Sequence, residues 1–364
     1  MKMTENDLYD FIKSIKPLDF AACESARKYQ SKLAMPPGSL GVLQELAIQM
    51  AGITGNIKNE VAKKRIVVFC ADNGVVEEGV ASAPQSVTAL QAVNMTKFKT
   101  GMSVIAKKMG CEVEVVDVGI KCTYECEKIL NKKIRLGTNN ISKSAAMTRD
   151  ECITAIGIGI ELAKKAKAEG IQILGTGEMG IGNTTTSTAV LCALTKTQPD
   201  LITGRGGGIT DEALAKKKQI IQRSLQVNKP NANDVLDVLS KVGGFDIAGM
   251  CGLFLGGAQC HLPIVIDGYI SVVAALCAKR ISSVSADYFI PSHKSKEKGY
   301  VLAAEELGVK PFLDLNMRLG EGSGCPLAFE VVEAACTIMN DMASFDGAGI
   351  DDSYLTEIRK QRDF

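Results

Sequence analysis

The run RIVVFC at residues 65–70 is the first of several short β-branched segments that decide the fold. The others are EVEVVDVGI (112–120), IQILGTG (171–177), LPIVIDG (262–268), DYFIPS (287–292) and FLDLNMRLG (312–320). Segments with helical spacing lie between them. This alternation is typical of a parallel sheet covered by helices on both faces, because parallel strands are usually joined through a helix. The sequence therefore predicts an α/β fold with a Rossmann-like parallel sheet flanked by helices.

The N-terminal segment has the spacing of helices rather than strands. Thr4 and Asp7 match a capping box, and Ser39 follows the helix-breaking tripeptide PPG. We expect three short helices between Thr4 and Gly55, with the third beginning at Ser39.

The C-terminal segment also returns to a helical pattern. Its predicted buried face consists of Leu327, Val331, Ala334, Ala335, Ile338 and Met342. We expect residues 1–60 and 326–364 to form a small helical domain beside a large α/β substrate-binding domain at 61–325.

Composition narrows the class of partner. The chain has 364 residues, 46% of them hydrophobic, and a formal net charge of +1, which does not favour nucleic acid or a membrane surface as partner.

The first sixteen residues contain acids and helical spacing, unlike a secretory or transit peptide, so a cytoplasmic location is expected. The apolar stretch 242–281 is interrupted by Asp246, Gln259, His261 and Asp267 and predicts protein core, not a membrane span.

The cysteines do not form a metal-binding pattern. Twelve are scattered, mostly in apolar runs, without a C-x-x-C pair, and the chain has only two histidines. We expect reduced structural thiols, and neither a metal site nor a cofactor.

Glycine-rich or polar loops directly follow the predicted strands. They are ADNGV (71–75), GTGEMGIGNTTT (175–186), DGY (267–269), PSHKSKEKG (291–299) and GEGSG (320–324). Ligands of open parallel sheets bind beyond the carboxyl ends of the strands. These loops are therefore expected to converge on one crevice.

The loop GTGEMGIGNTTT partly matches two nucleotide-binding motifs. Asn183 stands where a P-loop has its lysine, which disfavours triphosphate hydrolysis. Asp200 has the spacing of the acid in a dinucleotide-binding motif but follows a helix, which disfavours NAD. The remaining interpretations are backbone amides and a helix starting near Asn183 that bind a phosphate, ribose or carboxylate, or a tight turn between strand and helix.

Two further segments have groups suited to a phosphate. Lys217 lies in a run of three lysines after TGRGGGITDEALA, although such a run is often a solvated helix face. PSHKSKEKGY has Ser292 at the end of a predicted strand, and the alternative is a polar surface turn.

The segment GEGSG places a carboxylate, Glu321, inside a glycine frame. The amides of Gly322 to Gly324 and the helix opened by Pro326 suit an anion, which Glu321 would repel. Either Glu321 is a solvated loop residue, or the ligand has two ends and Glu321 removes a proton from the second. A glutamate in an apolar crevice has a raised pKa and is a competent general base.

With these motifs the sequence resembles the nicotinate-nucleotide:dimethylbenzimidazole phosphoribosyltransferases of cobalamin nucleotide-loop assembly. The motifs that carry the resemblance occur in order along almost the whole chain: PPGSLGVLQELA, ADNGVVEEGVASAPQSVTALQAVNM, GTGEMGIGNTTT, SKVGGFDIAGMCGLFLGGA, PSHKSKEKG and MRLGEGSG. The resemblance implies transfer of phosphoribose from nicotinate mononucleotide to a benzimidazole, with inversion and without metal, by a homodimer.

The resemblance also implies roles for individual residues. Glu321 matches the family's general base. The base pocket is expected to contain Ala83, Pro84, Gln91 and Leu319. The nucleotide and phosphate contacts are expected among Glu178, Gly180, Asn183, Thr184, Lys217, Ser292, Gly322 and Ser323.

One position departs from the family and leaves the acceptor open. Residue 83 is alanine, where relatives often carry a hydroxyl, so the acceptor is dimethylbenzimidazole, another benzimidazole, adenine or a phenol. Two other classes stay open: a non-catalytic or partner-dependent nucleotide-binding homologue, and an NAD-dependent oxidoreductase.

Overall fold

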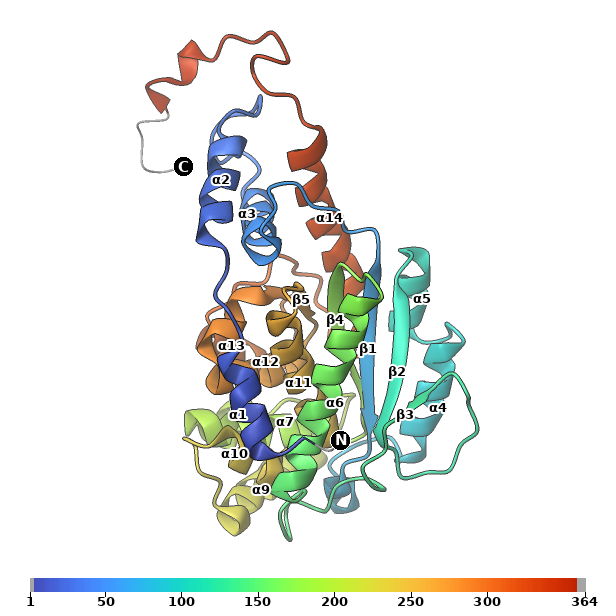
Figure 1. Ribbon diagram of the computed structural model, residues 1–364. Helices are drawn as coiled ribbons and strands as arrows, with labels where there is room; N and C mark the ends of the chain where they lie inside the picture. Colours follow the sequence, from blue (N-terminus) through green and yellow to red (C-terminus); the bar gives the residue numbers. More distant parts are fainter. Residues whose placement is uncertain (1–2, 359–364) are drawn as a thin grey trace.

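A computed structural model describes residues 3–358, which fold around one six-stranded sheet (Figure 1). The strand order is β3-β2-β1-β4-β5-β6, and every pair is parallel. This is a doubly wound order, in which β1 and β4 lie side by side where the direction of winding reverses. The strands are β1 (Lys64–Ala71), β2 (Glu112–Gly119), β3 (Leu130–Asn131), β4 (Ile173–Met179), β5 (Ile264–Ile266) and β6 (Phe289–Pro291).

Helices cover both faces of this sheet. They are α1 (Glu5–Lys13), α2 (Phe20–Gln30), α3 (Val42–Thr54), α4 (Ser86–Thr96), α5 (Gly101–Lys108), α6 (Arg149–Ala168), α7 (Asn183–Thr195), α8 (Pro199–Ile202), α9 (Asp211–Asn228), α10 (Val235–Val242), α11 (Phe245–Gln259), α12 (Tyr269–Ile281), α13 (Tyr300–Leu307) and α14 (Cys325–Asp341), with 3₁₀ turns η1 (Gly74–Glu78), η2 (Ser283–Tyr288) and η3 (Ser353–Leu355). No helix among residues 3–358 is both long and apolar enough to span a membrane.

The central strand β1 divides the hydrophobic core into two layers. Its residues Val67 and Phe69 pack into a cluster that contains side chains of α6, α7, α11 and α12. Ile66 and Val68 point the other way, into a cluster with α3, α4, α5 and α14. Because successive side chains of a strand face opposite sides, this alternation requires helices on both faces. The predicted α/β fold with a parallel sheet flanked by helices is confirmed.

Five of the six predicted strands are confirmed, and the sixth is wrong. The segment 312–320 contributes only an isolated bridge from Leu313 to His293. It cannot continue as a strand, because Asn316 has a left-handed φ of 57° and Leu315 is 52% exposed. The sixth strand is instead β3, two residues inside a long connection, which hydrophobic patterning did not detect.

The helical termini follow the predicted pattern with local differences. Thr4 and Asp7 form the predicted capping box. The third helix begins at Val42, not at Ser39, because Ser39 lies in a turn that ends at Gly41 with a left-handed φ of 48°. The buried face of α14 is shifted by about one residue from the predicted one and consists of Cys325, Pro326, Ala328, Phe329, Val332, Ala335, Cys336 and Met339.

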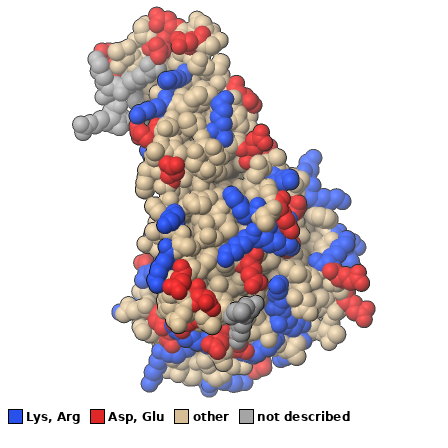
Figure 2. Space-filling model, viewed as in Figure 1, with Lys and Arg blue, Asp and Glu red and all other residues tan. Residues whose placement is uncertain are grey.

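The helices of the two termini do not all lie together. Figure 1 shows α2, α3 and α14 grouped beyond one end of the sheet, whereas α1 lies beside α6. Arg149 at the start of α6 bonds Glu5 of α1 at 2.6 and 2.8 Å. The division into a small helical domain (1–60 and 326–364) and a large domain (61–325) stays a prediction. On the face shown in Figure 2, basic and acidic side chains are interspersed, as the small net charge leads one to expect.

Candidate active site

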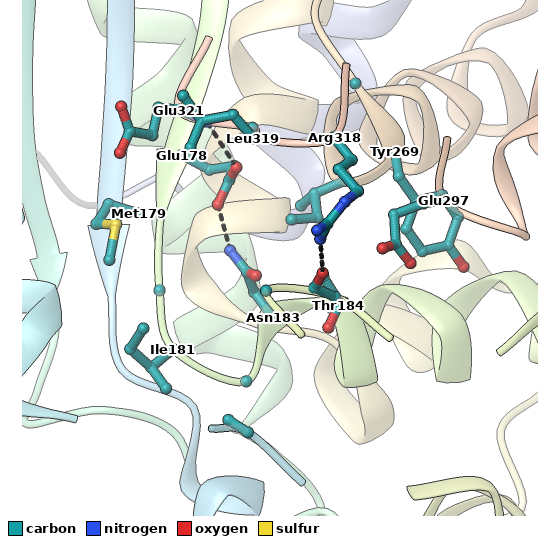
Figure 3. Close-up of a pocket in the computed structure, with 18 of the residues that line it drawn as sticks. Glu178, Met179, Ile181, Asn183, Thr184, Tyr269, Glu297, Arg318, Leu319 and Glu321 are labelled. Carbon is teal, nitrogen blue, oxygen red and sulfur yellow. Dashed lines mark hydrogen bonds between the residues drawn. The ribbon is translucent and has the colours of Figure 1, made fainter. Parts of the chain in front are cut away.

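A cavity opens beyond the carboxyl ends of β1, β4 and β5 (Figure 3). Its wall combines loops that are distant in sequence: 80–83, 178–184, 205–209, 267–271, 295–297 and 318–321. Four of the five predicted loops contribute to this wall. The fifth, ADNGV, stands behind it, where a Cβ on the wall residue Gly180 would lie 2.3 Å from the carbonyl oxygen of Ala71 and 3.1 Å from Asn73 Nδ2. The expectation of one crevice built from many loops is confirmed.

Glu321 lies in this wall on a strained turn. Its backbone is left-handed, with φ of 64°, and the flanking Gly320 and Gly322 have φ of 81° and 96°. A glutamate in this region is uncommon and persists only where surrounding contacts hold it. The turn directs a side chain that is only 6% exposed toward the first turn of α5. There its Oε2 accepts a hydrogen bond from the amide of Met102 at 3.3 Å.

Burial and hydrogen bonding act in opposite directions on Glu321. Burial raises the pKa of this carboxyl, whereas the Met102 amide and the Thr100 hydroxyl lower it, and burial is the larger effect. The nearby carboxylate of Asp267 raises the pKa further. A carboxylate with a raised pKa at the wall of a cavity is suited to accept a proton from a bound acid.

Glu178, at the end of β4, belongs to a buried network of polar side chains. Its Oε1 accepts a hydrogen bond from the amide of Glu321 at 3.1 Å, and its Oε2 accepts one from Asn183 Nδ2. The same Asn183 amide group donates to Asp246 Oδ2 at 3.2 Å. Burial raises the pKa of Glu178 well above its usual range and that of Asp246 to about 6. Burial therefore favours the protonated form of both carboxyls, and Asn183 offsets this effect by donating to each of them.

Lys217 lies behind Thr184, which lines the opposite end of the cavity. Its side chain is 1% exposed, and its Nζ donates to Thr184 Oγ1 at 2.8 Å. Burial lowers the pKa of Lys217 to about 8, and the nearby carboxylate of Glu297 offsets this shift only in part. Gly206 packs closely on this pair, because a Cβ there would lie 2.7 Å from Thr184 Oγ1 and 3.5 Å from Lys217 Nζ. A buried cation whose charge is only partly compensated, beside a glycine-rich loop, is suited to bind an anionic group.

Figure 3 shows how the two ends are arranged. Met179 and Ile181 lie on the same side as Glu321, and Thr184, Tyr269 and Glu297 lie on the other side. Arg318 lies between these groups and donates to the carbonyl of Gly206 at 3.1 Å.

The structure brings most predicted site residues to the cavity, and eight of them line it directly: Ala83, Gln91, Leu319, Glu178, Gly180, Asn183, Thr184 and Glu321. Lys217 reaches it through Thr184. Pro84 is exposed just outside the lining, before α4. The assignment of these residues to particular substrates stays a prediction.

The predicted phosphate contacts Ser292, Gly322 and Ser323 lie behind the wall. The amide of Gly322 donates to Asp267 Oδ2 at 3.0 Å, and Ser292 Oγ donates to the carbonyl of Asp267 at 3.0 Å. Ser323 is 1% exposed. The anion that the glycine frame holds is thus a protein carboxylate, and the role of these three residues in phosphate binding stays a prediction.

The glycines of GTGEMGIG lack a Cβ and so allow the Glu321 loop to pack closely on β4. A Cβ on Gly177 would lie 2.5 Å from the carbonyl oxygen of Glu321, and one on Gly175 would lie 2.7 Å from the Cβ of Cys325. Backbone contact at this distance is open only to glycine. The interpretation as a tight junction between strand and helix therefore accounts for these two positions, and the helix starts at Asn183 as expected.

Sequence patterns missed several residues of this site. Asp246 appeared only as an interruption of an apolar run, and Asp267 appeared as an interruption and in the loop DGY but was given no role of its own, although a carboxylate in such a run signals a buried, functional group. Thr100 and Met102, which hold Glu321, carried no recognisable signal, because their role arises from tertiary contact alone. Within residues 3–358 no three His, Cys, Asp or Glu side chains are grouped so as to hold a metal ion.

The fold and the cavity agree with known transferases. The model of a family described as Phosphoribosyltransferase matches residues 15–350. The chain belongs to this phosphoribosyltransferase family and is an enzyme of the pentosyltransferase class.

More particular relatives confirm the resemblance that the motifs indicated. The chain is 48% identical, over 99% of both chains, to the nicotinate-nucleotide--dimethylbenzimidazole phosphoribosyltransferase of Clostridium tetani. It is 49% identical to the protein of the same name from Clostridium perfringens, over 97% of this chain and 98% of that one. The solved structure of CobT from Thermus thermophilus matches with a TM-score of 0.88 and 36% identity, covering 92% of this chain and 100% of that one.

Proposed function

We propose that this enzyme transfers the phosphoribosyl group of nicotinate mononucleotide to 5,6-dimethylbenzimidazole or a related base. The products are nicotinate and α-ribazole 5′-phosphate, with inversion at the anomeric carbon. The names of the relatives support the choice of substrates. The single observation that carries the proposal is Glu321, a buried carboxylate with a raised pKa in the wall of the cavity.

The two ends of the cavity suit the two substrates. The mostly apolar lining near Glu321, with Leu319, Met179 and Ile181, suits a flat azole. The Lys217–Thr184 pair and the loop 204–208 suit the phosphate of the donor. Glu178 and Asn183 lie between these ends and offer hydrogen bonds to the ribose.

The proposed chemistry needs one base and one direction of attack. The lone pair of an azole nitrogen forms the new bond to the anomeric carbon. The bond to the pyridinium nitrogen breaks, and its electron pair stays with nicotinate, which leaves with a neutral ring nitrogen and requires no general acid. The azole N–H proton moves to Glu321. Holding both reactants in line in one cavity contributes much of the acceleration.

Substitution of Glu321 by Gln tests this role. The variant keeps the size of the side chain and removes the basic oxygen. We expect calorimetric binding of nicotinate mononucleotide to persist and turnover to fall about 100- to 10,000-fold, the range of a general base. Unchanged turnover would show that Glu321 is not the base.

We also propose, from the family resemblance, that the enzyme is a cytoplasmic homodimer. Light scattering coupled to size-exclusion chromatography tests the dimer: a mass near twice 38.7 kDa is expected, and a mass of 38.7 kDa contradicts it.

A further inference from the structure

Two buried carboxylates hold the loop that carries Glu321. Three consecutive residues, 320 to 322, have left-handed backbones. The amide of Glu321 donates to Glu178, whereas the amides of Gly322 and Gly324 donate to Asp267 Oδ2 at 3.0 Å and Oδ1 at 2.6 Å. Each oxygen of Asp267 thus fixes one amide within the three residues that follow Glu321.

Asp267 is itself firmly held at the end of β5. Its amide donates to Ser271 Oγ at 3.0 Å, and its carbonyl accepts from Ser292 Oγ at 3.0 Å. Ser271 Oγ in turn lies 2.6 Å from Thr176 Oγ1 on the neighbouring strand β4. The carboxylate, which belongs to a residue that is 2% exposed, is therefore aimed by both strands next to the cavity.

The surroundings of Asp267 offer it amides rather than a cation. The nearest basic group within the described chain is His293, whose Nδ1 lies 3.9 Å from Oδ1. Burial lowers the pKa of His293 to about 4, so this ring is neutral at physiological pH. Burial raises the pKa of Asp267 to about 7, and the amides of Gly324, Gly322 and Gly268 act against burial by favouring the ionised form. In return, the hydrogen bonds to Asp267 fix the amides of Gly322 and Gly324.

We propose that Asp267 is a positioning residue for Glu321: it holds the amides of Gly322 and Gly324 and thereby keeps Glu321 in its left-handed turn, aimed at the acceptor. The inference rests on the proposed role of Glu321 as the base. In this proposal the amides of Gly322 and Gly324 bind the carboxylate of Asp267 both with and without substrate in the cavity.

A double-mutant cycle on the full-length enzyme tests this proposal. Asp267→Asn keeps the shape of the side chain but replaces one acceptor oxygen by an NH₂ group that faces a backbone N–H. The loop that carries Glu321 therefore loses a hydrogen bond, and kcat is expected to fall about 10- to 100-fold. The KM for nicotinate mononucleotide should change less than about threefold, because the Lys217 end is untouched. In a Glu321→Gln background the same substitution should change kcat less than about threefold, since there is no base left to position. Equal factors in both backgrounds, or an unchanged kcat in the single variant, would overturn the proposal.

Asp117→Asn is a matched control. Asp117 is also a buried carboxylate at a strand end, and its Oδ1 holds the amides of Gly119 and Ile120 at 3.0 and 2.8 Å. Its loop carries no residue of the cavity wall. Asp117 Oδ2 also accepts from the Tyr124 hydroxyl at 2.6 Å and lies 3.2 Å from Lys133 Nζ, so we expect this variant to lose at least as much stability as Asp267→Asn and yet to retain its kcat. An equal loss of kcat would show that the effect is general destabilisation.

Hydrogen exchange on the unmodified enzyme keeps the proposal testable if Asp267→Asn does not fold. We expect the amides of Gly322 and Gly324 to be strongly protected without ligand and to change little when nicotinate mononucleotide is added. Rapid exchange that slows only with the mononucleotide would overturn the proposal. This result does not depend on turnover, so it separates failure of this inference from failure of the proposed function.

Discussion

Lys217→Met is the perturbation that tests the phosphate end of the cavity most sharply. Methionine keeps an unbranched side chain of similar length in a site that is 1% exposed, and it removes the ammonium group. The ammonium bonds Thr184 Oγ1 at 2.8 Å, and the Glu297 carboxylate attracts it too weakly to offset the effect of burial. It is therefore free to form a charge-assisted hydrogen bond with the phosphate of the donor.

The expected loss follows from that one contact. A hydrogen bond to a charged group contributes about 1.5–3 kcal/mol. At about 1.4 kcal/mol per factor of ten, kcat/KM for nicotinate mononucleotide should fall about 10- to 150-fold. The riboside that lacks the phosphate should be used equally well by both enzymes. The assay is nicotinate release with each donor, and an equal fall for the two donors would refute the phosphate contact.

The same variant has a second, independent consequence for stability. Because burial lowers the pKa of Lys217 to about 8, the folded enzyme binds this proton less readily than the unfolded chain does. The lysine therefore destabilises the ligand-free enzyme at pH 7, and this penalty disappears as pH rises from about 8 toward 10.5. Ligand-free Lys217→Met should melt at or above the temperature of the wild-type enzyme at pH 7. A clearly lower melting temperature would contradict the pKa argument.

Three further predictions concern other parts of the structure. Since burial raises the pKa of Glu321, the acid limb of the kcat–pH profile should have its midpoint above 4.5, and a midpoint at or below 4.5 would contradict its buried state. Gly177→Ala places a Cβ 2.5 Å from the carbonyl oxygen of Glu321, so both activity and thermal stability should fall, whereas a fully active enzyme would show that the loop is not packed on β4. Lys64→Met removes the buried ammonium that joins β1 to Glu330 and Glu333 of α14. Urea denaturation should show a free energy of unfolding that is lower by about 1–3 kcal/mol, and kcat should be unchanged. Loss of kcat would link this ion pair to the site.

The sequence predicts the sheet well because its strands are strongly patterned. RIVVFC and its four confirmed successors are buried runs that end in glycine-rich or polar loops, and the carboxyl ends of parallel strands necessarily meet at one edge. The segment 312–320 misled the same reasoning. Its apolar residues Leu313, Leu315 and Leu319 alternate as in a strand, but nothing in the sequence reveals that no neighbouring strand is available beyond one bridge.

The site was predictable as a set of loops but not as a set of contacts. Glu321 stood out because a carboxylate among glycines contradicts a simple anion site. That the amides of Gly322 and Gly324 are bound to Asp267 could not be read from the sequence, since the two segments are more than fifty residues apart and meet only in the folded chain. The same holds for Met102, whose amide reaches Glu321 across 219 residues.

The central claim is tested most directly by product analysis with the unmodified enzyme. Nicotinate mononucleotide is incubated with dimethylbenzimidazole, benzimidazole, adenine or cresol, without added metal, and the products are identified by mass spectrometry and their anomeric configuration by NMR. We expect nicotinate release and an α-riboside 5′-phosphate, most rapidly with a benzimidazole. Measurable binding of the mononucleotide without any riboside product, or a product of β configuration, would contradict the account.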